Sequence, residues 1–503
     1  MMKSLNFLRK TELLSAALTM TTVALVGLLF LLGWFASPAS AGPGVLFVKP
    51  GGTGAECSQA NPCDLQIALA QANDGDAVYL AQGVYTGSSA AVITVTKSIT
   101  LYGGWDGTTA TPVVRDPQAY QTVLDGEGVR RGIYISGTLS PVLDGLIVSD
   151  GNATGLGGYK SVATTYDAGG GIYVYKASVV INNCVIINNA AGANGTGGGV
   201  FLWSSNARVE NSLIISNTAA WGGGMRAISA APLIRDNRFL SNTASFGGGL
   251  FLMWSYSTVE GNVFRNNQAT NGGALYLSGD SSTVLGNLIE DNQGGYGAGL
   301  GVASGLQAVI SGNLILSNTA VYEGGGIRIT YNDAEVQNNV LAHNGADEGA
   351  GIYITGASPR LRHNTLAQNT GGDGIGILVE ANAQAALTNT ILVSHTVGIS
   401  VTTGSTATLE GILWGTGAWA NGADWGGDGA IITGTVNVRG DPKFVDPANG
   451  DYHIGSGSAA INAGVEAGLA TDIDGDPRPT GTAPDIGADE FVARVYLPLV
   501  VRE

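Results

Sequence analysis

Charged residues are scarce in this chain, and most of those present are acidic. They make up 12% of 503 residues, with 23 lysines and arginines against 39 aspartates and glutamates, for a net charge of −16. A surface so poor in positive charge repels polyanions, whereas nucleic-acid affinity depends on contacts to phosphates. The composition therefore excludes nucleic acid and anionic membrane surfaces as partners and leaves neutral glycans, cations and proteins.

Cysteine and histidine are scarcer still, with three cysteines and four histidines. No histidine is paired with a cysteine at ligand spacing, so no metal site is expected. Cys57 and Cys63 flank a short loop, and such a pair predicts a local disulfide in an exported chain. Cys184 occupies a repeat position and is expected to be a small buried residue.

Long apolar runs are absent except at the start of the chain. The run Leu13–Trp34 follows three basic residues and precedes Ala39-Ser40-Ala41, a small-residue cleavage pattern. These features predict a signal peptide over residues 1–41, with an uncleaved N-terminal anchor as the alternative because the run is long. In both cases the protein is expected to be secreted or held at the cell surface.

Glycine, by contrast, is abundant, with 78 residues. Glycine-rich segments recur with a period of about 25 residues, starting at Gly169, Gly197, Gly222, Gly247, Gly272, Gly297, Gly324, Gly349 and Gly374. A fixed period in this range indicates a solenoid whose units bury their apolar sides by stacking. Apolar and freer positions alternate after each run, which is the period of a strand. Each unit is therefore predicted to be one coil of an all-β parallel β-helix.

Asparagines repeat with the same period. One set comprises Asn217, Asn242, Asn267, Asn292, Asn318, Asn344 and Asn369, and the other comprises Asn237, Asn262, Asn287, Asn313, Asn339 and Asn364. Asparagine tolerates left-handed turns, and its amide can bond to copies above and below. We expect both sets to stack inside the coils or at their turns, with a structural role.

The repeats and their flanks divide the chain into segments. We expect a short helix from Leu65 to Ala72, capped by Asp64, and a loop inserted into a coil from Asn152 to Asp167. The predicted segments are a signal peptide or anchor (1–41), an N-terminal cap with irregular early coils (42–167), regular coils (168–400), late irregular coils (401–440), a C-terminal cap (441–491) and an apolar tail (492–503).

Motifs at both ends resemble known β-helix proteins. Cys57-x5-Cys63, followed by Ala68–Asp76 and Leu80–Tyr85, resembles the opening of pectin-lyase-like right-handed β-helix proteins. The C-terminal region of the "choice-of-anchor" group of bacterial surface β-helix proteins is similar to Asp441–Asp446, Gly450–Ile454, Ser458–Gly464, Asp472–Pro479 and Asp485–Glu490. The repeats also resemble the GGA and FxxN units of polymorphic outer-membrane adhesins. These resemblances imply a right-handed, single-stranded parallel β-helix with caps at both ends.

The outward position of each repeated strand is a candidate glycan-binding stripe. Its candidate members are Tyr173, Phe201, Arg226, Phe251, Tyr276 and Tyr353. Aromatic faces suit sugar rings, and guanidinium groups suit acidic sugars. Plain stacking of aromatics on a β surface would explain the same residues.

A second stripe, just before the glycine runs, ends in Glu323, Glu348 and Asp373. Adjacent coils lie about 4.8 Å apart, so these carboxylates are expected to form a row. Such a row near Arg328 could serve as the acid and base of a glycosidase or lyase, or could hold Ca²⁺. An acidic turn edge with no chemistry is the alternative. Asp472, Asp474 and Asp476 alternate like a calcium loop, but Pro477 replaces the required glycine, so this segment is interpreted as a structural turn.

The sequence therefore predicts an exported, non-catalytic surface protein, glycan-binding or adhesin-like. Its expected partner is a polysaccharide, a cell-surface glycan or another surface protein, and no cofactor is expected. The membrane would be contacted only through the N-terminal segment or the apolar tail. A polysaccharide lyase or glycoside hydrolase acting along the β-helix groove is the alternative, in which Glu323, Glu348, Asp373 and Arg328 would be catalytic.

Overall fold

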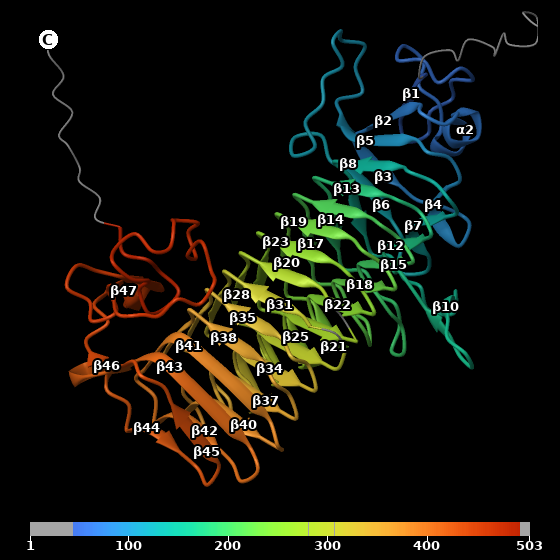
Figure 1. Cartoon of the computed structure of the whole chain (residues 1–503). Coiled ribbons are helices and arrows are strands. Elements are labelled where there is room, and N and C mark those ends of the chain that lie inside the picture. Colours follow the sequence, from blue (N-terminus) through green and yellow to red (C-terminus); the bar gives the residue numbers. More distant parts are fainter. Residues whose placement is uncertain (1–43, 280, 306, 493–503) are drawn as a thin grey trace, which may run out of the picture. The chain divides into compact units, whose positions relative to one another are not determined.

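The computed structural model describes residues 44–492 except 280 and 306. From Val45 onward, these residues form one compact unit in which successive coils are stacked (Figure 1). The predicted signal peptide or anchor and residues 493–503 of the apolar tail lie outside the described residues. In the described part, no helix has the length and apolarity needed to cross a membrane.

Strands that follow the glycine runs form one parallel sheet, called here the glycine sheet. Among the described residues it has 13 strands. In spatial order they are β4 (Ala91–Val95), β7 (Arg131–Ser136), β12 (Ile172–Tyr175), β15 (Val200–Trp203), β18 (Met225–Ile228), β22 (Leu250–Met253), β26 (Leu275–Ser278), β30 (Leu300–Ala303), β34 (Ile327–Thr330), β37 (Ile352–Thr355), β40 (Ile375–Glu380), β42 (Val397–Val401) and β44 (Ala423–Gly426).

A second sheet, called here the long sheet, contains two parallel ladders. The first ladder runs β1 (Val45–Val48), β2 (Ala77–Ala81), β5 (Thr100–Trp105), β8 (Val142–Asp144), β13 (Val180–Asn182), β16 (Arg208–Glu210), β19 (Leu233–Arg235), β23 (Thr258–Glu260), β27 (Thr283–Leu285), β31 (Val309–Ser311), β35 (Glu335–Gln337), β38 (Arg360–Arg362), β41 (Gln384–Val393), β43 (Thr406–Gly415) and β45 (Ala430–Thr433).

The second ladder shares β41 and β43 with the first. Its other strands are β3 (Gly83–Tyr85), β6 (Thr122–Asp125), β9 (Ile147–Ser149), β14 (Val185–Ile187), β17 (Leu213–Ile215), β20 (Arg238–Leu240), β24 (Val263–Arg265), β28 (Leu288–Glu290), β32 (Leu314–Leu316), β36 (Val340–Ala342), β39 (Thr365–Ala367) and β46 (Asn437–Gly440).

Shorter elements complete the described part. A third parallel sheet contains β21 (Thr243–Phe246), β25 (Gln268–Asn271), β29 (Gln293–Tyr296) and β33 (Thr319–Glu323). Two antiparallel pairs are β10 (Gly158–Lys160) with β11 (Thr165–Asp167), and β47 (Phe444–Asp446) with β48 (Asp451–Ile454). The helices are α2 (Leu65–Gln71), η1 (Gly417–Trp419) and η2 (Pro447–Asn449).

The strand register is the one that the repeat predicts. In the glycine sheet, Tyr173 pairs with Phe201 and Phe201 pairs with Arg226 in successive coils. Ile172 and Val174, on either side of Tyr173, are fully buried in the main core. The prediction of an all-β parallel β-helix is confirmed.

The glycine runs are required by two constraints. The first glycine of a run, such as Gly247 with φ of +62°, adopts the left-handed conformation that side chains disfavour. The second approaches the next coil closely, since a Cβ on Gly248 would lie 2.4 Å from the carbonyl oxygen of Gly273. Larger residues at either position would strain the chain or push the coils apart.

Both sets of asparagines lie inside the solenoid and are at most 1% exposed. Asn267 is typical: its Nδ2 donates to Oδ1 of Asn292 at 3.0 Å, and its own Oδ1 accepts from Nδ2 of Asn242 at 3.0 Å. Its Nδ2 also donates to the carbonyl of Phe239 at 2.8 Å. The left-handed conformation belongs to the residue before it, Asn266 with φ of +57°. The ladder asparagines are therefore internal connectors between coils, while their neighbours make the turn.

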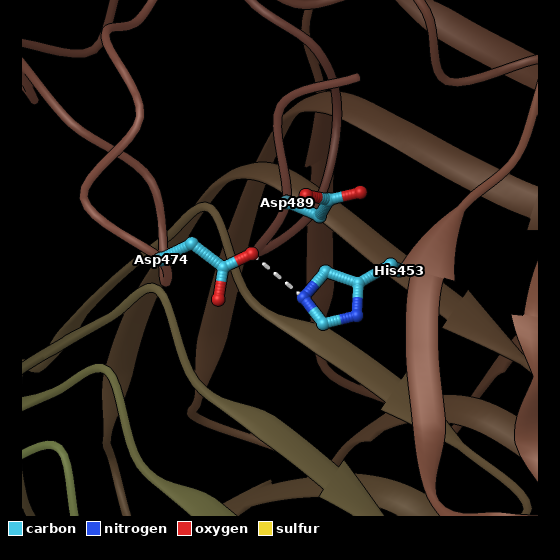
Figure 2. Close-up of side chains that lie close together, drawn as sticks. All are labelled: His453, Asp474 and Asp489. Carbon is cyan, nitrogen blue, oxygen red and sulfur yellow. Dashed lines mark ion pairs between the residues drawn. The ribbon is translucent and has the colours of Figure 1, made fainter. Parts of the chain in front are cut away.

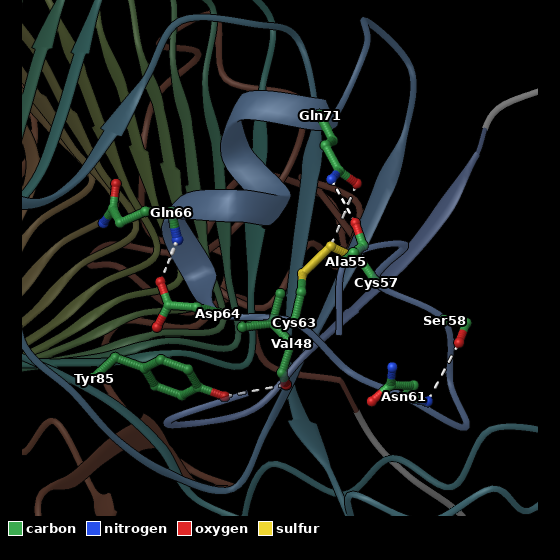
Figure 3. The surroundings of a disulfide bond; sticks show 10 residues. All are labelled: Val48, Ala55, Cys57, Ser58, Asn61, Cys63, Asp64, Gln66, Gln71 and Tyr85. Atoms are coloured by element: carbon green, nitrogen blue, oxygen red, sulfur yellow. Dashed lines mark hydrogen bonds between the residues drawn. A yellow bond between two sulfur atoms is a disulfide. The ribbon is translucent and has the colours of Figure 1, made fainter. Parts of the chain in front are cut away.

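The N-terminal region contains the predicted helix and disulfide. Asp64 caps α2 by accepting a hydrogen bond from the backbone N–H of Gln66 at 2.9 Å. The structure joins Cys57 and Cys63 in a disulfide beside this helix (Figure 3). Cys184 is a free, buried thiol, and burial raises its pKa to about 12, so it is an inert core residue.

The C-terminal segment, residues 441–491, packs against the outer face of the second ladder. The shared apolar cluster combines Val340, Ala342, Ala367, Ile391, Val393 and Leu413 with Tyr452, Ile454, Ala460, Ile486 and Ala488. Arg362 donates to the carbonyl of Ala467 at 3.0 Å, and the N–H of Ala488 donates to Thr365. This segment was expected to act as a cap, but these contacts place it on the side of the solenoid.

A buried ion pair holds the C-terminal segment together. Arg478 and Glu490 are 3.2 Å apart, with side chains 1% and 0% exposed. Asp472 accepts hydrogen bonds from the backbone N–H groups of Asp474, Asp476 and Glu490. The carboxylate of Asp472 thus organises the turn, in agreement with its interpretation as structural.

Replacing Asn267 with leucine should lower the free energy of unfolding by about 1–3 kcal/mol, because amides in two neighbouring coils lose buried partners. Chemical denaturation would measure this effect. Gln268→Leu, an adjacent change at an exposed amide, is the matched control and should have little effect. Equal stability of the two variants would show that the internal ladder contributes nothing.

Candidate functional site

The predicted glycan stripe is aligned but largely covered. Residues at the outward position pair in order from Tyr173 to Tyr353, including Gly301 and Arg328. Tyr173, Phe201, Arg226, Phe251 and Tyr353 are between 0% and 5% exposed, whereas Tyr276 is partly exposed. Most of the stripe therefore cannot act as an open row of platforms.

The inserted hairpin β10–β11 accounts for the covering of its first half. Tyr159 contacts Phe201 with ring centres 5.8 Å apart, and Tyr166 contacts Trp221 at 5.1 Å. The hydroxyl of Tyr173 donates to the carbonyl of Gly158 at 2.8 Å. The predicted loop is thus a hairpin that folds over the outer face of the glycine sheet.

A surface pocket of about 340 Å³ opens beside this hairpin. Its lining residues are Tyr159, Ser161, Tyr166, Trp221, Arg226, Phe246, Phe251, Met253, Trp254, Tyr276 and Ser278. Its volume lies in the range of about 300–1,000 Å³ that is usual for small-ligand sites. Seven of these eleven residues are tyrosine, phenylalanine or tryptophan, so aromatic rings form most of the wall.

Trp254 forms the exposed rim of the pocket, with 54% of its surface accessible. It lies against Gly279 of the next coil, where a Cβ would come within 2.6 Å of the indole Cδ1. Glycine at this position therefore lets the indole lie close to the backbone of the neighbouring coil. The ring remains available to contact a ligand.

Arg226 is the charged group of the pocket and is 5% exposed. The guanidinium carbon lies 4.7 Å from the ring centre of Phe251, 5.5 Å from Trp221 and 5.6 Å from Tyr159. One nitrogen, Nη1, donates to Oγ1 of Thr196 at 2.8 Å, while Nε is buried without a hydrogen-bond partner.

The charge of Arg226 has no anionic partner. Among the described residues, no carboxylate lies within 4.0 Å of its guanidinium nitrogens. Burial lowers the pKa of Arg226 to about 10, so the group stays charged at neutral pH. Buried charges are normally paired, and a cation left unpaired beside a pocket favours an anionic ligand.

The predicted carboxylate row lies farther along the same face. Glu323 pairs in register with Glu348, and the backbone N–H of Asp373 donates to the carbonyl of Asp347. Arg328 forms an ion pair with Glu323 at 2.7 Å, and Tyr353 donates a hydrogen bond to Glu380. The cation and the phenol near the row are thus already bound to carboxylates.

Burial and repulsion between like charges both raise pKa values in the carboxylate row. Burial raises the pKa of Glu348, and the neighbouring carboxylates of Glu380, Glu323, Asp373 and Asp347 raise it further. Burial also raises the pKa of Asp373. The side chain of Glu348 is only partly desolvated and is exposed overall, so solvent screens much of this repulsion.

The structure therefore divides the sequence candidates into three groups. Arg226, Phe251 and Tyr276 meet in the aromatic pocket, whereas Tyr173 and Phe201 lie buried near the hairpin. Tyr353 belongs with Arg328 and the carboxylates. Sequence reasoning missed Tyr159, Tyr166 and Trp254, which lie outside both periodic stripes. The two tyrosines in the aperiodic insertion were the available signal.

Comparison with known proteins identifies the family. Residues 127–305, 198–366 and 271–413 match the family described as "Right handed beta helix region", and together they span more than half of the chain. The protein therefore belongs to this family, and the predicted right-handed β-helix is confirmed. No curated protein matches the chain.

Solved structures of low sequence identity are also similar. The pectate lyase Pel9A has 14% identity and a TM-score of 0.36, with 90% of this chain and 97% of the lyase covered. The periplasmic alginate epimerase AlgG has 9% identity and a TM-score of 0.41, with coverage of 77% and 84%. The Dettilon tailspike protein has 14% identity and a TM-score of 0.36, with coverage of 78% and 68%.

Proposed function

We propose that this protein is an exported, non-catalytic β-helix that binds an acidic glycan in the aromatic pocket around Arg226. The unpaired, buried guanidinium of Arg226 is the observation that carries this proposal. A carboxylate or sulfate on a sugar would supply the missing anion and accept a charge-assisted hydrogen bond. We also propose, from the sequence motifs, that the protein is a surface adhesin of the choice-of-anchor group.

The walls of the pocket suit the rest of a sugar. Trp254 offers an exposed ring face at the rim, and Tyr276 is partly exposed beside it. Aromatic faces pack against the C–H groups of a pyranose ring, while the charged group is held at Arg226. Recognition would therefore combine one fixed ionic contact with stacking, and sugars without an acidic group would bind more weakly.

The acidity of the rest of the protein limits what the pocket can hold. With a net charge of −16, the protein repels polyanions at long range. Binding of an acidic glycan must then come from close contacts in the pocket. We therefore expect recognition of a short segment of the glycan, and affinity is best compared near 0.15 M salt, where the screening length is about 8 Å.

Replacing Arg226 with methionine should reduce binding of polygalacturonate or alginate at least tenfold, because a charge-assisted contact contributes about 1.5–3 kcal/mol. The same variant should melt at an unchanged or higher temperature, since an uncompensated buried charge is removed. Isothermal titration and thermal unfolding would measure the two effects.

Arg328→Met is the matched control for this substitution. It removes an arginine from the same stripe but leaves the carboxylate of Glu323 without its ion-pair partner. It should therefore lower stability while leaving glycan binding intact. Undiminished binding by Arg226→Met would refute the proposed role of this arginine.

Trp254→Ala tests the stacking contact separately. This change should weaken glycan binding about tenfold without altering the fold, because the indole is exposed. Tyr256→Ala, two residues away, removes a ring that is 68% exposed and lies outside the pocket, and should bind like the wild type. If both variants bind alike, the rim does not contact the ligand. Phe251 is unsuitable for this test because it is buried against Arg226.

A lyase or hydrolase remains the second candidate function, supported by the raised pKa of Glu348 among its neighbouring carboxylates. Against it, Arg328 is already paired with Glu323. Incubation with acidic and neutral polysaccharides should yield neither unsaturated products nor new reducing ends, with the wild type or with Glu348→Gln. Turnover by the wild type that Glu348→Gln abolishes would establish the enzyme instead.

A further inference from the structure

Three side chains from separate parts of the C-terminal segment converge at one point. His453 lies on β48, Asp474 lies in the turn that Asp472 organises, and Asp489 lies near the end of the described chain (Figure 2). One potential ligand atom from each residue lies within 4.8 Å of the other two. The cluster combines an imidazole nitrogen with carboxylate oxygens, which is a mixed set of metal donors.

The imidazole of His453 is held in position by a fourth residue. Its Nδ1 lies 2.6 Å from Oδ1 of Asp451, so this carboxylate fixes the ring and directs Nε2 toward the cluster. Nε2 is 2.9 Å from Oδ2 of Asp474, yet it is buried and makes no aligned hydrogen bond. A carboxylate that orients a ligating histidine through its other nitrogen is the usual outer partner in metal sites.

Asp489 provides a separate indication of a missing cation. It is 8% exposed, and its carboxylate accepts one hydrogen bond, from the N–H of Ile454 to Oδ2 at 2.7 Å. No other donor to this carboxylate is found among the described residues. A buried acid with an unused oxygen is unfavourable unless a positive charge lies beside it.

The cluster lines a pocket of about 470 Å³ that is strongly acidic. Its lining contains Asp451, Asp474, Asp476 and Asp489 as well as Glu490, and His453 is its one basic residue among those described. The lining contains no lysine or arginine, and Arg478, which lies outside it, is paired with Glu490. The pocket therefore has the charge and the opening needed to admit a cation from solvent.

We propose that His453, Asp474 and Asp489 bind one divalent transition-metal ion of the Zn²⁺ class. A tetrahedral site with bonds of about 2.0–2.2 Å has ligand atoms about 3.3–3.6 Å apart. The separations here, 2.9 Å for one pair and at most 4.8 Å for all, bracket that range and require only small movements. Ca²⁺ fits less well, because it takes six to eight oxygen ligands and no imidazole.

The bound ion would add a shared link among three segments that already contact one another, since the N–H of Ile473 donates to the carbonyl of Ala488 and the N–H of Ile454 donates to Asp489. β48, the turn near Asp474 and the turn near Asp489 would share one coordination centre. The fourth position would face the pocket and hold water. The ion would thus stabilise the fold of the C-terminal segment itself.

Titration of the metal-free exported protein with ZnCl₂ tests the proposal. One equivalent should bind, and the melting temperature should rise with Zn²⁺ because only the folded protein holds the site. Asp474→Ala should weaken binding at least tenfold, because it removes one of the three ligands. His453→Gln should do the same. Co²⁺ in place of Zn²⁺ should give the visible absorption of a low-coordinate nitrogen and oxygen site in the wild type alone.

Asp428→Ala is the matched control, because it removes one exposed carboxylate outside the pocket. It should bind Zn²⁺ like the wild type and gain the same thermal stabilisation. The proposal is overturned if the wild type shows no saturable Zn²⁺ binding or if Asp474→Ala and His453→Gln retain full affinity. Equal affinity for Ca²⁺ at the same residues would overturn the assignment to a transition metal.

Discussion

Buried asparagine amides connect each coil to the next, and the rest of the structure depends on the register that they fix. Within each column, an amide away from the ends donates to the copy in one neighbouring coil and accepts from the copy in the other, as Asn267 does between Asn242 and Asn292. If a strand slipped by one residue, its apolar side chains would point outward and these amides would lose their hydrogen-bond partners. Hydrophobic burial gives the coils a core, whereas the asparagines specify how the coils align.

The same alignment produces the outer surface. Because every coil begins a strand at the same position, outward residues stack into columns, and one insertion in an early coil can fold over several later ones. The hairpin β10–β11 does this and converts an exposed column into a pocket that holds Arg226. An unpaired guanidinium is unfavourable for folding, but the many coil contacts on either side can offset it. The contacts between coils therefore provide the stability of the fold, and the pocket does not have to contribute to it.

The sequence predicted the features that repeat from coil to coil and those formed by residues close together in the chain. The strands, the coil register, the asparagine columns, the Asp64 cap and the Cys57–Cys63 bridge all follow from spacing alone. Burial of the outer column could not be predicted, because it depends on Tyr159 and Tyr166 in a segment without a period. The convergence of His453, Asp474 and Asp489 could not be predicted either, because these residues are far apart in the sequence and come together only when the C-terminal segment folds.

The placement of residues 441–491 has a consequence for the order in which the protein matures. Their apolar side chains cover outward residues of β36, β39, β41 and β43, including Val340, Ile391 and Leu413. A chain that emerges from its N-terminus forms these coils before the segment that covers them exists. Nascent or truncated chains would therefore expose an apolar strip along one side of the solenoid and would tend to aggregate. In the full-length protein, residues 441–491 cover this strip.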